Sequence, residues 1–218
     1  MNCKALSFHT RRGIAAAVGA AALLLVGAVS PAQAARITPP VVPANLHVDA
    51  GSRVFLVGHA LGTQNYVCSP SPASPSGVAY VLFTPIAALF DNHGRQITTH
   101  FFSPNPNVAD PNTNPAVIAD GAIRPTWQAK DNSSVWVKLH ANGSANVTPG
   151  ALAWLLLDVA GTAEGLGGGD LLEKTTQIHR VNTVGGVAPA QGCASVADVG
   201  HSAFVDYAAD YYFYTKRN

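Results

Sequence analysis

Residues 203–214, AFVDYAADYYFY, alternate in character over a full strand length, and this alternation constrains the fold more than any other feature. The two alternating sets are Val205, Tyr207, Ala209, Tyr211 and Phe213, and Asp206, Ala208, Asp210, Tyr212 and Tyr214. Successive side chains of a strand point to opposite faces, so a period of two rich in aromatic residues predicts a β-strand. We expect Tyr207 and Tyr211 in the core, with Asp206 and Asp210 on the solvated face.

Apolar runs of strand length recur along the chain and are separated by turn signals. RVFLVGHA (53–60) and TQNYVC (63–68) are interrupted at Leu61 and Gly62, and VAYVLF and IAALFD are interrupted at Pro85. The tripeptide at 92–94, Asn-His-Gly, predicts a hairpin turn. ALAWLLLDVA (151–160) is short for a helix and apolar throughout, so we interpret it as a buried strand.

Roughly eight to ten strands joined by long loops rich in Pro, Gly and Asn predict an all-β fold. We expect a single-domain antiparallel β-sandwich over residues 46–218, and a closed β-barrel is the alternative. Residues 35–45, ARITPPVVPAN, form a Pro-rich lead-in that we expect to be extended and loosely held.

The first 34 residues have the pattern of an export signal. Lys4, Arg11 and Arg12 give a basic start, residues 14–29 are apolar, and residues 32–34, Ala-Gln-Ala, form a cleavage site. A membrane anchor over 14–29 is the alternative, which the short run and the cleavage pattern disfavour. The arginine pair leaves the general and twin-arginine routes both open. We expect a secreted protein, extracellular or in the cell envelope, without a membrane segment after cleavage.

Charge and cysteine content narrow the function classes further. Removing the three cations of residues 1–34 from the 13 Lys and Arg leaves ten against 12 Asp and Glu, which gives no electrostatic support for nucleic acid as a partner. Cys3 is lost with the signal, so Cys68 and Cys193 remain. In an exported protein this pair predicts one disulfide, with two buried free thiols as the alternative.

Several motifs resemble, in their order, the secreted family catalogued as domain of unknown function 3455. They are GTQNYVC, HFFSPNP, PTWQAKDNSSVWVK, AWLLL, IHRVNTVGGVAPAQGC and VDYAADYYFY, and the resemblance covers about residues 40–215. It implies an exported single domain without an established activity. Some fungal members carry the label malate dehydrogenase, which this sequence does not support, because it lacks a G-x-G-x-x-G turn and βαβ alternation.

The family-like motifs contain polar and aromatic residues that we predict to line a ligand concavity. These ligand-binding candidates are Gln64, Tyr66, His100, Trp127, Arg180 and Asn182. Arg180 and Asn182 are expected on one strand face with Ile178, where they form a polar floor unless Arg180 pairs with an acid. The following Gly185 and Gly186 lack the lysine of a phosphate-binding loop and are interpreted as a turn.

We therefore expect a non-catalytic extracellular binding or surface-associated module, with an unknown small molecule or an extracellular surface component as its partner. No complete catalytic motif, metal-ligand spacing or cofactor motif is present, and we predict no metal and no cofactor. Two alternatives stay open. One is a secreted hydrolase or His-dependent metal-binding enzyme that uses His100 or His179 with a nearby aspartate. The other is a structural envelope or cell-wall protein, which exposed strand edges or an apolar patch would indicate.

Overall fold

The computed structural model describes residues 37–103 and 123–217. The predicted signal peptide, residues 1–34, lies outside this part of the chain. The described strands are β1 (Ser52–Pro70), β2 (Val78–Phe90), β3 (Gln96–Ser103), β4 (Arg124–Ala129), β5 (Ser134–Ala145), β6 (Trp154–Ala163), β7 (Gln177–Gly185) and β8 (Ser202–Lys216). Two single-turn 3-10 helices, η1 (Ala44–Leu46) and η2 (Val196–Asp198), lie before β1 and between β7 and β8.

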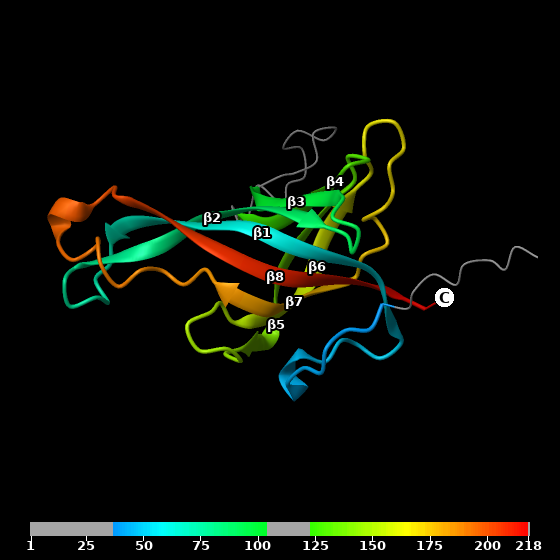
Figure 1. The fold of residues 1–218 in the computed structure, drawn as a ribbon, viewed down its shortest axis with the longest axis horizontal. Helices are drawn as coiled ribbons and strands as arrows, with labels where there is room; N and C mark the ends of the chain where they lie inside the picture. The colour runs from blue at the N-terminus through cyan, green and yellow to red at the C-terminus, as the bar shows by residue number, and fades with distance from the viewer. Residues whose placement is uncertain (1–36, 104–122, 218) are drawn as a thin grey trace, which may run out of the picture. The chain divides into compact units, whose positions relative to one another are not determined.

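Each strand pairs antiparallel with the next in sequence, and β8 pairs with β1 to close a barrel. Figure 1 shows β8 running beside β1, and their ladder extends from Ser52–Lys216 to Val67–Ser202. The all-β antiparallel prediction is confirmed. The sheet forms the closed barrel that was the alternative prediction, and the β-sandwich that was preferred is wrong. Closure gives every described strand two neighbours, although residues 78–86 of β2 pair only with β1.

The strands β1 and β2 are continuous where the sequence predicted breaks. A Cβ atom on Gly62 would lie 2.1 Å from the carbonyl oxygen of Ile86. Glycine is therefore required at this position so that β2 can approach closely, and it makes no turn. Pro85 lies inside β2 opposite Gln64, near a shift in register. It removes one N–H group from the ladder without ending the strand.

Inward-facing side chains from all the strands form the main hydrophobic core. Its fully buried members include Trp127, Val135, Ile178 and Phe213. Tyr211 is 1% exposed and Tyr207 is 4% exposed, so the predicted core parity of β8 is confirmed. The prediction that residues 151–160 contain a buried strand rather than a helix is also confirmed, since β6 covers Trp154–Ala163.

A second hydrophobic cluster lies on the outer surface of the barrel, under the segment that precedes β1. Leu46, Trp154, Leu156 and Tyr214 are buried there, and Ile37 packs against them. The expectation of a loosely held lead-in is wrong for Ile37 and Val42, because these side chains pack against the cluster, whereas Val41 is 95% exposed.

The predicted disulfide joins Cys68, near the end of β1, to Cys193, in the loop between β7 and β8. Backbone hydrogen bonds support the same junction, with Gly200 N–H donating to the carbonyl of Cys68 and Cys68 N–H donating to the carbonyl of His201. The disulfide is confirmed, and the alternative of two free thiols is not. The long loop 186–201 is thereby attached to the barrel.

Candidate functional site

The barrel encloses a cavity of about 200 Å³. Its floor and inner walls are buried and consist of Gln64, Pro85, His100, Trp127, Leu157 and Tyr211. Its rim is half-buried and consists of Leu82, Phe102, Pro125, Leu155 and Arg180. These residues come from β1, β2, β3, β4, β6, β7 and β8, so the cavity exists only because the sheet closes.

Aromatic rings form the floor of the cavity. The rings of His100 and Trp127 stack with centroids 4.1 Å apart and an interplanar angle of 7°. Tyr211 meets them from β8, with its ring centroid 5.1 Å from that of Trp127 and 5.4 Å from that of His100. The stacked pair follows from the register, because His100 of β3 lies opposite Trp127 of β4.

The protonation state of His100 is set by its surroundings. Its Nδ1 lies 2.9 Å from the backbone carbonyl oxygen of Thr126, and since a carbonyl only accepts, Nδ1 carries the proton. Burial lowers the pKa of His100 to about 3, against an opposing hydrogen bond to Thr126, and the charge of Arg180 lowers it further. At neutral pH the imidazole is neutral, and its Nε2 is a hydrogen-bond acceptor.

Two buried polar side chains of the cavity lack hydrogen-bond partners among the described residues. Neither polar atom of the Gln64 amide makes a hydrogen bond of ordinary length with a described residue, although this side chain is only 1% exposed and the Tyr207 hydroxyl lies near enough to interact with it. The indole N–H of Trp127, which is fully buried, is also unpaired. Buried polar groups without partners typically cost about 1–3 kcal/mol each, so natural proteins keep them where a ligand or ordered water completes them.

Arg180 supplies the charge of the cavity. Its Nε and Nη2 atoms both donate to the carbonyl oxygen of Ala153, at 3.1 and 2.9 Å. In the ladder Arg180 lies between Leu155 of β6 and Tyr211 of β8. The sequence allowed for pairing of Arg180 with an acid, and none of the carboxylates in the described part of the chain forms an ion pair with it.

The structure brings four of the six sequence-predicted candidates together in this cavity: Gln64, His100, Trp127 and Arg180. Tyr66 is buried elsewhere, where its hydroxyl donates to the carbonyl of Gly186 at 2.5 Å. Tyr66 is therefore a packing residue of the barrel and does not line the cavity.

The side chain of Asn182 does not lie on the face of β7 that the sequence predicted. Its φ of 50° lies in the left-handed region, and the register of β7 against β8 shifts between Val181 and Val184. This irregularity turns the side chain outward, where Asn182 Nδ2 donates to Asp210 Oδ2 at 2.8 Å. The predicted polar floor of Arg180 with Asn182 is therefore wrong, because a bulge breaks the alternation.

Sequence reasoning missed the apolar rim of the cavity. Phe102 comes two residues after His100, and Pro125 two residues before Trp127, so both share the inward parity of a named candidate. Strand parity could have identified these two residues. Leu82 and Leu155 could not have been found this way, because they reach the site only through the pairing of distant strands.

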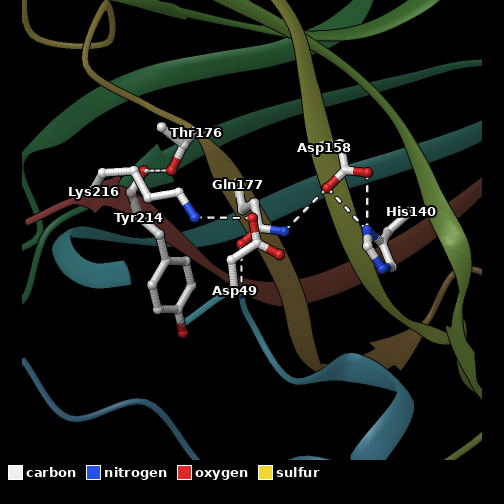
Figure 2. Close-up of polar contacts among 7 residues, drawn as sticks. All are labelled: Asp49, His140, Asp158, Thr176, Gln177, Tyr214 and Lys216. Carbon is white, nitrogen blue, oxygen red and sulfur yellow. Dashed lines mark hydrogen bonds and ion pairs between the residues drawn. The ribbon is translucent and has the colours of Figure 1, made fainter. Parts of the chain in front are cut away.

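One histidine paired with a carboxylate, His140, lies outside the cavity in a polar network (Figure 2). His140 Nδ1 lies 2.9 Å from Asp158 Oδ2, and Gln177 Nε2 donates to Asp158 Oδ1 at 3.1 Å. The backbone N–H of Asp49 donates to Gln177 Oε1, and its carboxylate accepts from Lys216 Nζ at 2.9 Å. The network connects the turn before β1 to β5, β6, β7 and β8.

The enzyme alternative required His100 or His179 beside a carboxylate. His179 instead has Nε2 2.6 Å from the carbonyl oxygen of Leu46 and Nδ1 3.0 Å from the Tyr214 hydroxyl. His59 pairs with Asp210 at 2.6 Å, but on the outer face. Among the described residues, no group of three or more His, Cys, Asp and Glu side chains is placed to hold a metal ion.

Exposed apolar side chains gather on the outer faces of β8, β1 and β2. Phe204, which is 72% exposed, lies opposite Asn65 of β1, and Phe83, which is 69% exposed, lies at the register shift next to the Asn65–Thr84 pair. Leu61 and Ile86 continue this face. Exposed apolar residues on neighbouring strands and an unpaired strand edge are the two signs expected for the structural-protein alternative, and residues 78–86 of β2 have such an edge among the described strands.

Acidification from pH 6.5 to 4.5 is expected to destabilise the protein through His100 and His179. Burial lowers the pKa of both residues below 6.5. Below pH 6.5 the unfolded chain therefore binds protons at these two histidines that the folded chain does not bind. The free energy of unfolding is highest above pH 6.5 with respect to these two groups, and it decreases as the pH falls. Each histidine contributes up to about 1.4 kcal/mol per pH unit.

The measurement is urea denaturation across this pH range. We expect His100→Gln to reduce the slope by up to about 1.4 kcal/mol per pH unit, whereas the exposed control His93→Gln leaves it unchanged. Carboxylates contribute little above pH 4.5. The pKa of His59 is raised by its hydrogen bonds to Asn92 and Asp210, so its stabilisation is lost at higher pH instead. An unaltered slope in His100→Gln contradicts the assignment.

Eight antiparallel strands, closed around a cavity with an aromatic floor and one arginine at its rim, define an up-and-down barrel with an interior site. The chain belongs to the family described as "Protein of unknown function (DUF3455)", which matches residues 49–215. The resemblance drawn from its motifs is thus confirmed. No curated protein and no solved structure matches the chain. Within the described ranges, no helix is both long and apolar enough to cross a membrane.

Proposed function

We propose that this protein is a non-catalytic, exported binding module that takes a small molecule into the interior of its barrel. The observation that carries the proposal is the Gln64 amide, which is 1% exposed, lines the cavity and makes no hydrogen bond of ordinary length with a described residue. A bound molecule would complete its hydrogen bonds. Most of the remaining lining is apolar, and apolar walls with a few orienting polar groups are typical of small-molecule sites.

The chemistry of the cavity favours binding over catalysis. His100, the titratable imidazole at its floor, is held neutral by burial and donates to a backbone carbonyl. The histidines with carboxylate partners among the described residues, His59, His140 and His201, lie outside the cavity. General acid–base catalysis requires a titratable group near the working pH within reach of the substrate, and binding makes no such demand.

Export is supported by two features. The pattern of residues 1–34 is that of a signal peptide, and the Cys68–Cys193 disulfide is of the kind that persists in oxidising compartments. A disulfide that attaches a loop beside the cavity-bearing barrel also suits a module that must stay folded outside the cell.

Nuclear magnetic resonance titration of the isotopically labelled protein with benzoate, benzamide and indole tests the proposal. We expect at least one probe to bind with a dissociation constant in the millimolar range or below and to shift the indole N–H resonance of Trp127. The resonance is identified by its loss in Trp127→Phe. Leu155→Trp should abolish binding, because the larger side chain fills the half-buried rim.

The matched control is Leu61→Trp, which introduces the same side chain at a position 61% exposed on the outer face of β1. This variant should bind the probes as the unmodified protein does. If none of the probes shifts Trp127, or if the shifts persist in Leu155→Trp, the barrel interior is not the binding site.

A further inference from the structure

The described lining of the cavity contains one positive charge and no carboxylate. Of the described residues that line the cavity, Arg180 alone is charged at neutral pH, since His100 is neutral. None of the ion pairs in the described part of the chain includes Arg180. A half-buried cation in a largely apolar site is stabilised by an anion, so the electrostatics favour a negatively charged ligand.

One backbone carbonyl holds the guanidinium of Arg180 in place. Two of its nitrogens, Nε and Nη2, donate to the carbonyl oxygen of Ala153. A carbonyl orients the group without neutralising it, and a guanidinium has five N–H donors, so donors remain for a ligand. Because the side chain is already fixed, a ligand that binds it does not have to order it.

The rest of the lining limits the ligand to one acidic group on an apolar body. Leu82, Phe102 and Pro125 give the rim apolar surfaces, and Trp127 lies at the floor. A single planar guanidinium matches the geometry of one carboxylate. The volume of about 200 Å³ is smaller than that of a drug-sized site, so the ligand has about the size of a single substituted ring.

We propose, as a step that rests on the proposed function, that the cavity binds a small aromatic monocarboxylate. Its carboxylate lies on Arg180, and its ring lies between the apolar rim and the aromatic floor. The unpaired amide of Gln64 is a further donor and acceptor for the carboxylate or for a polar substituent of the ring. The neutral Nε2 of His100 can accept a hydrogen bond from a hydroxyl group.

Three nearly isosteric probes separate charge from shape. Benzoate, benzamide and benzamidinium have the same ring and carry one negative charge, no charge and one positive charge, respectively. Each is titrated into the labelled protein, and the dissociation constant is read from the Trp127 indole resonance. We expect benzoate to bind at least about tenfold more tightly than benzamide, as a charge-assisted pair requires, and benzamidinium to bind most weakly.

Two substitutions test the role of Arg180. Arg180→Met should abolish the preference for benzoate, because benzoate loses a charge-assisted pair whereas benzamide loses at most a hydrogen bond to a neutral acceptor. Arg180→Lys keeps the charge without the planar fork, so a smaller preference for benzoate should remain. The control is Arg53→Met, which removes an exposed arginine of β1 and should change neither affinity. Thermal unfolding of each variant verifies that it is folded.

The outcomes distinguish this inference from the proposed function. If benzoate and benzamide bind equally, or if Arg180→Met keeps the preference for benzoate, the anion inference is wrong and the cavity remains a binding site. If Arg180→Met does not fold, the Arg180→Lys variant provides the test. An unchanged preference for benzoate over benzamide in that variant contradicts the need for a guanidinium. If none of the three probes binds but indole does, only the anion inference fails, and if indole does not bind either, the proposed function fails with it.

Discussion

Replacing both cysteines of the Cys68–Cys193 disulfide by serine lowers the free energy of unfolding by roughly 5 kcal/mol. The two residues are 125 positions apart, so the disulfide removes the closure entropy of a very long loop from the unfolded chain. In the chain-entropy model a loop of about 100 residues corresponds to ~4.7 kcal/mol. A loss of this size is comparable to the whole stability of many small domains.

Urea denaturation of the double Ser variant and of the unmodified oxidised protein measures this loss. The matched control is Tyr80→Phe, which removes the hydrogen bond from the Tyr80 hydroxyl to the Gly192 carbonyl while the disulfide remains. We expect the control to lose only about 1 kcal/mol, as for a single hydrogen bond. Equal denaturation midpoints for the double Ser variant and the unmodified protein would refute the prediction.

Trp127→Ala is expected to lower the free energy of unfolding by about 3–5 kcal/mol, as is typical when a large buried aromatic side chain is truncated. The Trp127 ring is fully buried and contacts the rings of His100, Tyr211 and Phe213. Truncation leaves a space in the middle of the barrel. The surrounding strands cannot move inward to fill it, because each is hydrogen-bonded to a neighbour on both sides. Trp127→Phe, which keeps an aromatic ring, should lose clearly less.

The control for this substitution is Phe204→Ala, which truncates an aromatic residue that is 72% exposed on the outer face of β8. Its effect should stay within about 0.5 kcal/mol. Denaturant unfolding of the three variants gives the comparison. If Trp127→Ala and Phe204→Ala cost the same, Trp127 does not anchor the core, and the description of the barrel interior is wrong.

The part of the candidate site that the sequence predicted depends on local alternation. His100 and Trp127 lie in regular stretches of β3 and β4, where parity assigns the inward face reliably. Asn182 was assigned to the wrong face because a single residue at a φ of 50° shifts the parity of β7. Gly62 was taken as a turn, because the close approach of β2 that requires a glycine there depends on strand pairing.

The sequence by itself determined that the chain forms antiparallel strands, which residues of β8 face inward, and that Cys68 and Cys193 pair. Each of these properties depends on neighbouring residues or on residue type. The tertiary structure decided that the sheet closes through β1 and β8, that the segment 37–48 packs on the barrel, and that Arg180 meets Gln64 across a cavity. The physical reason is that a sandwich and a barrel bury the same alternating faces. They differ only in which distant backbone N–H and C=O groups are paired.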